Sequence, residues 1–342
     1  MRVLIADKFE KQGIDGLTAL GCAVVSEPAA GAEGLPAAVE KHDPQVLIVR
    51  STKVTAPSIG GAKSLRLIIR AGSGYDNIDI AAASGRGIAV CNCPGMNAVA
   101  VAELAMGLLL CCDRRLPDQT VDLRAGVWNK KEYGKARGLK GARLGVVGVG
   151  NIGAELIQRA AAFGMDIHVW SRSMSAERAR TLGARWWGSK PDELPALAAG
   201  CDAVSVHVAL TEDTRGLLGR EFFDAMTPGA YFINTSRGAV VDQSALAAAV
   251  TGKGVRCGLD VWGNQPQPTD TAFNDELAKL PGVYGTHHCG ASTDQAQLAV
   301  ADEVVRIVGV YKDTGRFENR VNGDALEPTV RKASISAERV TR

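Results

Sequence analysis

The stretch RLGVVGVGNIG at residues 143–153, followed by AELIQRAAAFG at 154–164, decides the fold. An apolar strand pattern runs directly into the spacing Gly148-x-Gly150-x-x-Gly153, and a helical pattern begins at once. These glycines permit a tight turn, close approach of the backbone to a pyrophosphate, and close packing of helix on strand, while the helix N-terminus supplies amide donors. The context predicts a dinucleotide-binding unit; the alternative is a glycine-rich turn that serves packing alone.

Strand and helix patterns alternate on both sides of this unit. Short β-branched runs precede it at RVLIAD (2–7), VLIVR (46–50), LRLIIRAG (65–72) and GIAVCNC (87–93). A six-strand set includes and follows it: RLGVVGVG (143–150), DIHVWS (166–171), AVSVHV (203–208), AYFINTS (230–236), VRCGLDVW (255–262) and VYGTHH (283–288). Repeated β-α units predict parallel sheets covered by helices on both faces. The fold class is therefore α/β, with two doubly wound parallel-sheet domains.

The order of these patterns predicts the domain organisation. The first domain takes residues 1–97, and the second, a Rossmann domain, takes 98–289. The helical pattern that follows is long enough to return to the first domain, so residues 290–322 complete it. The polar segment 323–342 lacks periodicity and is expected to be a frayed tail.

Composition excludes several classes of partner. The 342 residues are 46% apolar and carry a net charge of +2, which gives no reason to expect nucleic acid or an anionic membrane. The longest apolar stretch, 98–112, contains Glu103 and is too short to span a bilayer. Because a strand starts at residue 2 without a leader pattern, we expect a cytoplasmic protein. The eight cysteines lack paired C-x-x-C units, so no metal is expected.

The residues after the strand at 166–171 bear on the choice of dinucleotide. NAD sites usually place an acidic residue there to hold the ribose 2′-hydroxyl, whereas this chain has Ser171, Arg172 and Ser173. Asp166 precedes the strand and so points away from the site. Arg172 with two hydroxyls suits the 2′-phosphate of NADP. NADP is therefore favoured over NAD, the alternative being a solvated arginine beside a permissive NAD site.

Three later strand ends carry residues suited to hydride and proton transfer. Arg237 follows one strand, Asp260 ends the next and His288 ends the last. Ligands of open α/β sheets bind at such carboxyl ends. A guanidinium can bind the carboxylate of a 2-oxo acid and polarise its carbonyl, and an imidazole can exchange the hydroxyl proton. The hypothesis is a nicotinamide-dependent oxidoreductase with Arg237 and His288 as catalytic residues.

At this point the sequence resembles the D-isomer-specific 2-hydroxyacid dehydrogenases, and within them the D-3-phosphoglycerate dehydrogenases. The resemblance spans about residues 3–322 and includes RAGSGYDNID, NCPGMNAVAVAEL, GVGNIG, NTSRGAVVDQSAL and HHCGASTDQAQ. It implies a nucleotide domain inserted into a split, flavodoxin-like substrate domain. It also implies closure over the substrate and a homodimer formed through the nucleotide domain.

The resemblance also assigns individual residues. Arg237 matches the family's catalytic arginine and His288 its proton-transferring histidine, whereas His287 stands where proline is common. Cofactor contacts match Gly150, Asn151, Ile152, Ser171, Arg172, His207, Thr235, Asp260 and Gly290, beside Gly148 and Gly153 of the glycine motif. Substrate contacts match Ser73, Gly74 and Asn97, with Arg50 and Arg70 meeting a substrate phosphate.

One departure from the family pattern concerns its catalytic glutamate. Gln265 stands at that position, in DVWGNQP. A glutamine can accept the imidazole N–H and orient the ring, but it supplies no negative charge. The sequence therefore predicts a lower pKa for His288 than in relatives, so that reduction activity fades at a lower pH as the acid form of the histidine is lost.

Other functions remain open on the sequence. Formate dehydrogenases of this fold pair a glutamine with the histidine, and dinucleotide-sensing corepressors keep the arginine–histidine pair. A glyoxylate or hydroxypyruvate reductase is the nearest alternative, because reductive enzymes often use NADPH. The segment after residue 322 is too short for a serine-sensing domain, so we do not expect serine feedback through one.

Overall fold

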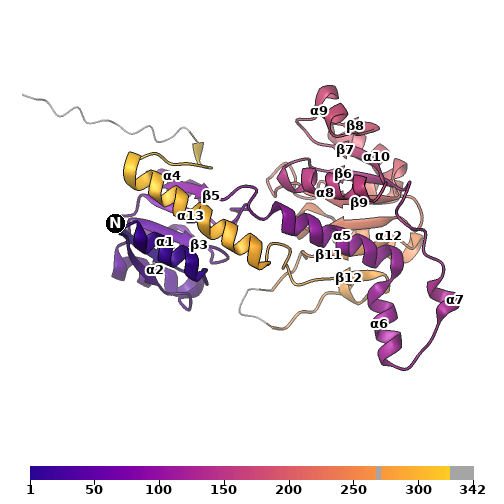
Figure 1. The fold of residues 1–342 in the computed structure, drawn as a ribbon, viewed down its shortest axis with the longest axis horizontal. Coiled ribbons are helices and arrows are strands. Elements are labelled where there is room, and N and C mark those ends of the chain that lie inside the picture. Colours follow the sequence, from indigo (N-terminus) through magenta and orange to yellow (C-terminus); the bar gives the residue numbers. More distant parts are fainter. Residues whose placement is uncertain (267–270, 324–342) are drawn as a thin grey trace, which may run out of the picture. The chain divides into compact units, whose positions relative to one another are not determined.

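The computed structural model describes residues 1–266 and 271–323. Backbone contacts divide the chain into two compact units (Figure 1). Of the described residues, unit 1 contains 1–71, 75–93 and 302–323, and unit 2 contains 72–74, 94–266 and 271–301. The sequence pattern predicted that the chain passes from the first domain to the second after residue 97 and returns to the first after residue 289. Apart from Gly323, the predicted tail lies outside the described residues.

Unit 1 is built on a five-stranded parallel sheet in the order β2-β1-β3-β4-β5. Its strands are β1 (Arg2–Ile5), β2 (Ala23–Ser26), β3 (Val46–Val49), β4 (Leu67–Arg70) and β5 (Ala89–Asn92), and its helices are α1 (Lys11–Ala19), α2 (Gly31–His42), α3 (Ala56–Gly60), α4 (Ile80–Gly85) and most of α13 (Asp294–Thr314). All four residues of β3 are buried, as expected for a parallel strand covered on both faces. Figure 1 shows α13, in yellow, beside α1, and the amide of Gln12 in α1 donates to Asp302 in α13.

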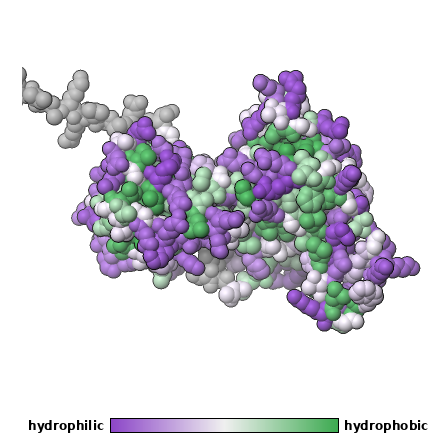
Figure 2. Space-filling model, viewed as in Figure 1, coloured by the Kyte–Doolittle hydropathy of each residue, from purple (hydrophilic) through white to green (hydrophobic). Residues whose placement is uncertain are grey.

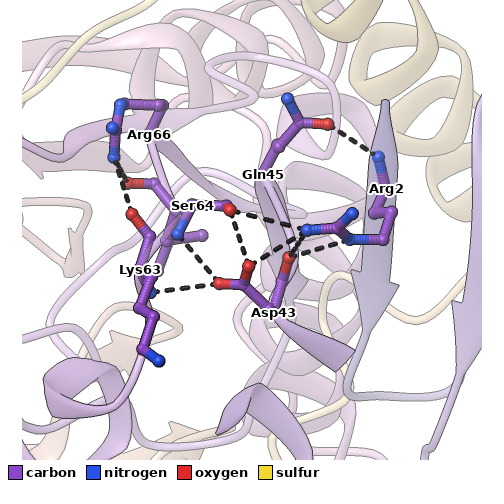
Figure 3. Close-up of polar contacts among 7 residues, drawn as sticks. Arg2, Asp43, Gln45, Lys63, Ser64 and Arg66 are labelled. Atoms are coloured by element: carbon purple, nitrogen blue, oxygen red, sulfur yellow. Dashed lines mark hydrogen bonds and ion pairs between the residues drawn. The ribbon is translucent and has the colours of Figure 1, made fainter. Parts of the chain in front are cut away.

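A polar network fixes the amino-terminal edge of this sheet (Figure 3). Asp43 ends α2 in the left-handed region, at φ 39°. Its Oδ1 accepts hydrogen bonds from the backbone N–H groups of Lys63 and Ser64, at 3.0 and 2.8 Å. Its Oδ2 accepts from the Ser64 hydroxyl at 2.6 Å and from Nη2 of Arg2 at 3.0 Å. These bonds, led by that of the Ser64 hydroxyl, lower the pKa of Asp43.

Unit 2 is built on a seven-stranded parallel sheet in the order β12-β11-β10-β9-β6-β7-β8. Its strands are β6 (Arg143–Val147), β7 (Asp166–Trp170), β8 (Trp186–Gly188), β9 (Ala203–Val206), β10 (Tyr231–Asn234), β11 (Arg256–Leu259) and β12 (Val283–Gly285). Its helices are α5 (Ala98–Arg114), α6 (Leu116–Arg124), α7 (Lys130–Tyr133), α8 (Asn151–Ala162), α9 (Ala176–Thr181), α10 (Leu194–Gly200), α11 (Arg220–Ala225) and α12 (Gln243–Lys253). Separate apolar clusters cover the two faces, one including Phe222, Phe223 and Phe232, the other Leu144, Leu156 and Tyr231.

The α/β class with two parallel sheets is confirmed, and every predicted strand is present. Two strands are additional, β2 and β8, so the predicted six-strand set of the second domain was wrong by one strand. Both are outermost in their sheets. β8 has only three residues, and β2 has no buried residue, so neither has the long apolar pattern that marks a central strand.

Candidate functional site

The carboxyl edge of the unit 2 sheet contains a switch in strand order. From β6 the chain proceeds outward through β7 and β8, and β9 then pairs with the other side of β6. On the two sides of such a switch, the loops that follow the strands run to opposite faces of the sheet. A crevice for a ligand forms between these loops. The loops after β6, β7 and β9 therefore meet at the place where a dinucleotide would bind.

The glycine motif has the geometry that its spacing predicts. Gly148 has φ 94°, in a region that other residues rarely adopt. A Cβ built on Gly153 would lie 2.2 Å from the Gly148 carbonyl oxygen, so the helix packs against the loop too closely for any side chain. Gly150 is the N-cap of α8, and no heavy atom of the described residues lies within 4 Å of a Cβ built on it. The backbone at the N-terminus of α8, where Asn151 and Ile152 begin the helix, is thus open to a phosphate.

Two buried polar atoms without hydrogen-bond partners in the described part of the chain are evidence for a dinucleotide site at this edge. Thr235, after β10, and His207, after β9, each bury an atom, Oγ1 and Nδ1 respectively, that has no hydrogen-bond partner among the described residues. The other ring nitrogen of His207 lies 2.9 Å from the Ser205 hydroxyl. Burial lowers the pKa of His207 to about 3, so the ring is neutral at physiological pH. Buried polar atoms normally have partners, and a nicotinamide dinucleotide carries the amide, hydroxyl and phosphate groups to provide them.

The residues after β7 form the part of the site that would contact the adenosine ribose. Asp166 was expected to precede the strand but is the first residue of β7; it pairs with Arg185 and lies at the opposite end of the strand from Ser171. Ser171 and Arg172 follow the strand, as predicted. Nη1 of Arg172 lies 2.7 Å from Oδ2 of Asp213 in the loop after β9. This ion pair was not predicted, because it joins two loops separated by a strand and 41 positions of sequence.

Arg237 lies in a tight turn after β10. The buried side chain of Asn234 accepts from the N–H and hydroxyl of Ser236, and its amide donates to the Arg237 carbonyl at 3.0 Å. Nη1 of Arg237 donates to the Ser236 carbonyl at 2.8 Å. A Cβ built on Gly238 would lie 2.2 Å from the carbonyl carbon of Trp262. The turn that carries Arg237 is therefore in direct contact with the segment that leads to Gln265.

Asp260 organises the loop that carries His288. Its side chain is 1% exposed. Oδ1 accepts from the Thr286 hydroxyl at 2.6 Å and from the Cys289 N–H at 2.8 Å, while Oδ2 accepts from the Gly290 N–H at 2.9 Å. The sequence predicted a cofactor contact for Asp260, and the structure adds these three bonds. Since they hold both sides of His288, Asp260 fixes the position of that residue.

His288 and Gln265 are hydrogen-bonded through their side chains. Nδ1 of His288 lies 3.0 Å from Oε1 of Gln265. His288 has φ 52°, an uncommon conformation for a residue with a side chain. Because an amide oxygen only accepts, Nδ1 carries the proton in this bond, and Nε2 is then the unprotonated nitrogen when the ring is neutral. A neutral glutamine thus orients the imidazole for proton exchange through Nε2.

The two arginines predicted to meet a substrate phosphate, Arg50 and Arg70, lie in unit 1. Arg70 ends β4 and is paired in register with Val49, so Arg50 follows at the neighbouring strand end. Oδ2 of Asp7, after β1, accepts from the backbone N–H groups of Arg50, Ser51 and Thr52 at 2.6 to 3.1 Å. Asp7 therefore fixes the backbone that carries Arg50. Asp7 was missed, although its place directly after a strand was a usable signal.

Ser73 and Asn97, which the sequence predicted to bind substrate, are in contact in unit 2. The Ser73 hydroxyl donates to Oδ1 of Asn97 at 2.7 Å. Asn97 is the residue that precedes the first turn of α5, and Gly72, before Ser73, has φ 141°. The AGSG segment thus turns sharply next to a helix N-terminus, and Gly74 follows in it. Among the described residues, no group of three or more His, Cys, Asp or Glu side chains is placed to hold a metal ion.

Comparison with known proteins places the chain in a family. Residues 106–290 match the family model described as "D-isomer specific 2-hydroxyacid dehydrogenase, NAD binding domain". A hydroxypyruvate reductase of Thermotoga maritima is 43% identical over 272 residues, which are 79% of this chain and 85% of the relative. A D-3-phosphoglycerate dehydrogenase of Archaeoglobus fulgidus is 36% identical over 332 residues, 96% of this chain. The chain spans only 60% of that relative's length.

A solved structure gives the same result for the fold. The NADPH-dependent glyoxylate/hydroxypyruvate reductase of Sinorhizobium meliloti, in complex with NADP and malonate, matches with a TM-score of 0.79 at 27% identity. The match covers 94% of this chain and 96% of that one. Within the described part of the chain, no helix has the length and apolarity needed to cross a membrane.

Proposed function

The chain belongs to the D-isomer specific 2-hydroxyacid dehydrogenases, and we propose that it interconverts a D-2-hydroxy acid and its 2-oxo acid with NAD(P). The proposed pair is 3-phosphoglycerate and 3-phosphohydroxypyruvate, the chemistry with which serine biosynthesis begins. The observation that carries the proposal is the order of β10, β11 and β12, adjacent strands that are followed by Arg237, Asp260 and His288 at one edge.

The nicotinamide ring supplies the hydride acceptor in oxidation and the hydride donor in reduction. We assign its binding to the glycine motif, to the N-terminus of α8, and to His207 and Thr235, whose enclosed polar atoms lack partners among the described residues. In oxidation the hydroxyl proton must leave as the hydride leaves C2. Nε2 of His288 accepts that proton in oxidation and returns it in reduction.

Arg237 and Gln265 prepare the reacting groups. The Arg237 guanidinium binds the carboxylate and the C2 oxygen of the substrate, and stabilises the charge on that oxygen as the carbonyl forms or is reduced. Gln265 accepts from Nδ1–H of His288 at 3.0 Å, which makes Nε2 the nitrogen that accepts a proton. Because Gln265 is neutral, it stabilises the imidazolium less than a carboxylate would, and His288 releases its proton more readily.

Arg50 and Arg70 support a phosphorylated substrate. They lie at neighbouring strand ends of unit 1, and Asp7 holds the backbone of Arg50 in place. A short acid such as glyoxylate has no group that requires these two cations. We assign Arg50 to the substrate phosphate, with Arg70 beside it, and Ser73, Gly74 and Asn97 to the carboxylate end.

The second candidate is a glyoxylate or hydroxypyruvate reductase. Arg172 after β7 favours it, since a cation there suits NADPH, the cofactor of reductive enzymes. The Thermotoga maritima relative, 43% identical, also carries the name hydroxypyruvate reductase. The two candidates share the mechanism above and differ in whether the substrate carries a phosphate.

We further propose that two copies of the chain associate through an arm made of residues 116–134, which includes α6 and α7. Large apolar side chains on this arm are exposed, and Trp128 is 80% exposed; the others are Leu116, Val121, Leu123 and Val127. Figure 2 shows green, hydrophobic surface at the lower right, where Figure 1 places α6. A second copy of the same arm would cover this surface, since symmetric pairing places like patches together.

A panel of steady-state assays tests the proposed function. The substrates are 3-phosphohydroxypyruvate, hydroxypyruvate and glyoxylate with NADPH and NADH, and 3-phosphoglycerate and formate with both oxidised cofactors. We expect the highest kcat/KM with the phosphorylated pair. A higher value with hydroxypyruvate would select the second candidate, and turnover of formate alone would overturn both.

A further inference from the structure

An ion pair joins two loops at the carboxyl edge of the unit 2 sheet, where a dinucleotide would bind. Arg172 follows β7 and Asp213 lies in the loop after β9, with Nη1 and Oδ2 2.7 Å apart. Their side chains are 56% and 75% exposed. β7 and β9 are the two strands that flank β6. The pair therefore joins the loops on either side of the glycine motif.

Both partners project from ordered turns. After β7, the N–H of Met174 donates to the Ser171 carbonyl at 2.8 Å, and the Met174 side chain is buried. In the other loop, the buried hydroxyl of Thr214 accepts from the Thr211 N–H at 2.8 Å and donates to the Ala209 carbonyl at 2.6 Å. These bonds fix the backbone at Thr214 and so position its neighbour Asp213. The Arg172–Asp213 pair therefore joins two loops whose backbones are both held by hydrogen bonds.

The loops that carry the pair pack directly on the glycine motif. The N–H of Gly148 donates to the carbonyl of Trp170, the last residue of β7, at 2.8 Å. A Cβ built on Gly148 would lie 2.8 Å from the backbone of His207 and of Val208, at the start of the other loop. A dinucleotide on the glycine motif would place its adenosine ribose between these loops, next to Arg172.

We propose that Asp213 is a specificity-determining residue that weakens selection of NADP over NAD. The inference rests on the proposed function, because it concerns the cofactor of that same site. A 2′-phosphate bound by Arg172 would carry between one and two negative charges and would meet the Asp213 carboxylate on the same guanidinium. The 2′-hydroxyl of NAD carries no charge and meets no such repulsion.

A second cation on this edge, Arg178, allows the effect of Asp213 on binding of a 2′-phosphate to be measured in a variant that lacks Arg172. The Arg178 guanidinium, from the first turn of α9, donates to the carbonyl of Val149 in the glycine motif. A 2′-phosphate near the motif would therefore retain one positive neighbour if Arg172 were lost. Asp213 forms its ion pair with Arg172, so its influence should depend on Arg172.

Calorimetric titration of the full chain with NADP⁺, NAD⁺, adenosine 2′,5′-bisphosphate and 5′-AMP tests the proposal without requiring turnover. We expect Asp213→Asn to tighten binding of the two 2′-phosphorylated ligands by about five- to tenfold, the size of a like-charge interaction near a surface. Binding of NAD⁺ and 5′-AMP should change less than about twofold on the same grounds. In an Arg172→Ala background the same substitution should have a smaller effect.

Glu212→Gln is the matched control, since it removes the same charge one position away, from a side chain that is 92% exposed and pairs with Arg215 instead. An equal gain with Glu212→Gln, an unchanged or weaker affinity for NADP⁺ in Asp213→Asn, or an equal gain with and without Arg172 would overturn the inference. Wild-type protein that binds neither dinucleotide would overturn the proposed function as well. Selective binding of dinucleotides without the Asp213 effect would overturn the inference alone.

Discussion

Nδ1 of His288 lies 3.0 Å from Oε1 of Gln265, so the ring that would exchange the substrate proton is oriented by a neutral amide. The two residues are 23 positions apart and come from segments that follow adjacent strands, β11 and β12. The pairing preserves the orientation that a carboxylate would give, and it leaves out the negative charge. The pH dependence of the enzyme is where this difference should be measurable.

The first prediction concerns Gln265→Glu. A carboxylate at hydrogen-bond distance favours the imidazolium, so the substitution should raise the apparent pKa of the activity profile by about one unit. Reduction, which needs the protonated ring, should then persist to higher pH, and oxidation should begin at higher pH. Profiles of kcat/KM in both directions measure this, with Gln265→Asn as the uncharged control. Superimposable profiles for wild type and Gln265→Glu would refute the role of charge at this position.

The second prediction concerns Arg50 and the substrate phosphate. If Arg50 binds a phosphate, Arg50→Gln should lower kcat/KM for 3-phosphohydroxypyruvate by about 10- to 100-fold, the worth of a charge-assisted hydrogen bond. The value for hydroxypyruvate should change little. Arg66→Gln is the control, since Arg66 bonds to carbonyls at the amino-terminal edge of the same sheet (Figure 3). Equal losses of kcat/KM for both substrates would mean that Arg50 supports the folded structure and does not bind the phosphate.

The third prediction concerns Asp43 and stability in acid. Since its pKa is lowered in the folded protein, Asp43 contributes stability above the ordinary value of about 3.9, and this is lost as pH falls through the lowered value. Asp43→Asn keeps a residue that tolerates the left-handed conformation. We expect a lower urea midpoint for this variant at pH 7 and a difference from wild type that shrinks as the pH falls below about 3.9. A difference that is constant with pH would show that the charge is irrelevant.

The fourth prediction concerns the arm at residues 116–134. Trp128→Glu should turn the proposed dimer into a monomer, because it places a charge within the apolar surface that the second copy covers. Light scattering after size exclusion measures the mass, and circular dichroism checks the fold. Trp187→Glu, at another exposed tryptophan of unit 2, is the control and should leave the mass unchanged. A monomeric wild-type chain would contradict the proposal.

Much of the fold was predictable because its signals are local. The glycine motif follows from adjacent residues, and the order of Arg237, Asp260 and His288 follows from the rule that parallel strands end at one edge. The pairing of Gln265 with His288 was inferred from the resemblance to the family, in which a glutamate at this position bonds the histidine. Strand order across the sheet is different, because it depends on packing between distant segments.

The contacts missed from the sequence are those that depend on this order. Arg172 and Asp213 meet because β7 and β9 flank β6, and no feature of either loop alone indicates that. β8 was missed because three residues at a sheet edge need no long apolar run. The place of Asp7 after a strand was a signal for a role, but its partners, backbone N–H groups 43 positions away, could not be read from the residue types around Arg50.

The most direct test of the central claim, that His288 exchanges the substrate proton at this site, is kcat for reduction of the best 2-oxo acid by wild type and by His288→Gln. We expect a loss of about 100- to 10,000-fold, the range for a missing general acid, with the affinity for NADPH changed by less than about threefold. A variant that keeps kcat within about tenfold of wild type would fall outside that range and contradict the claim.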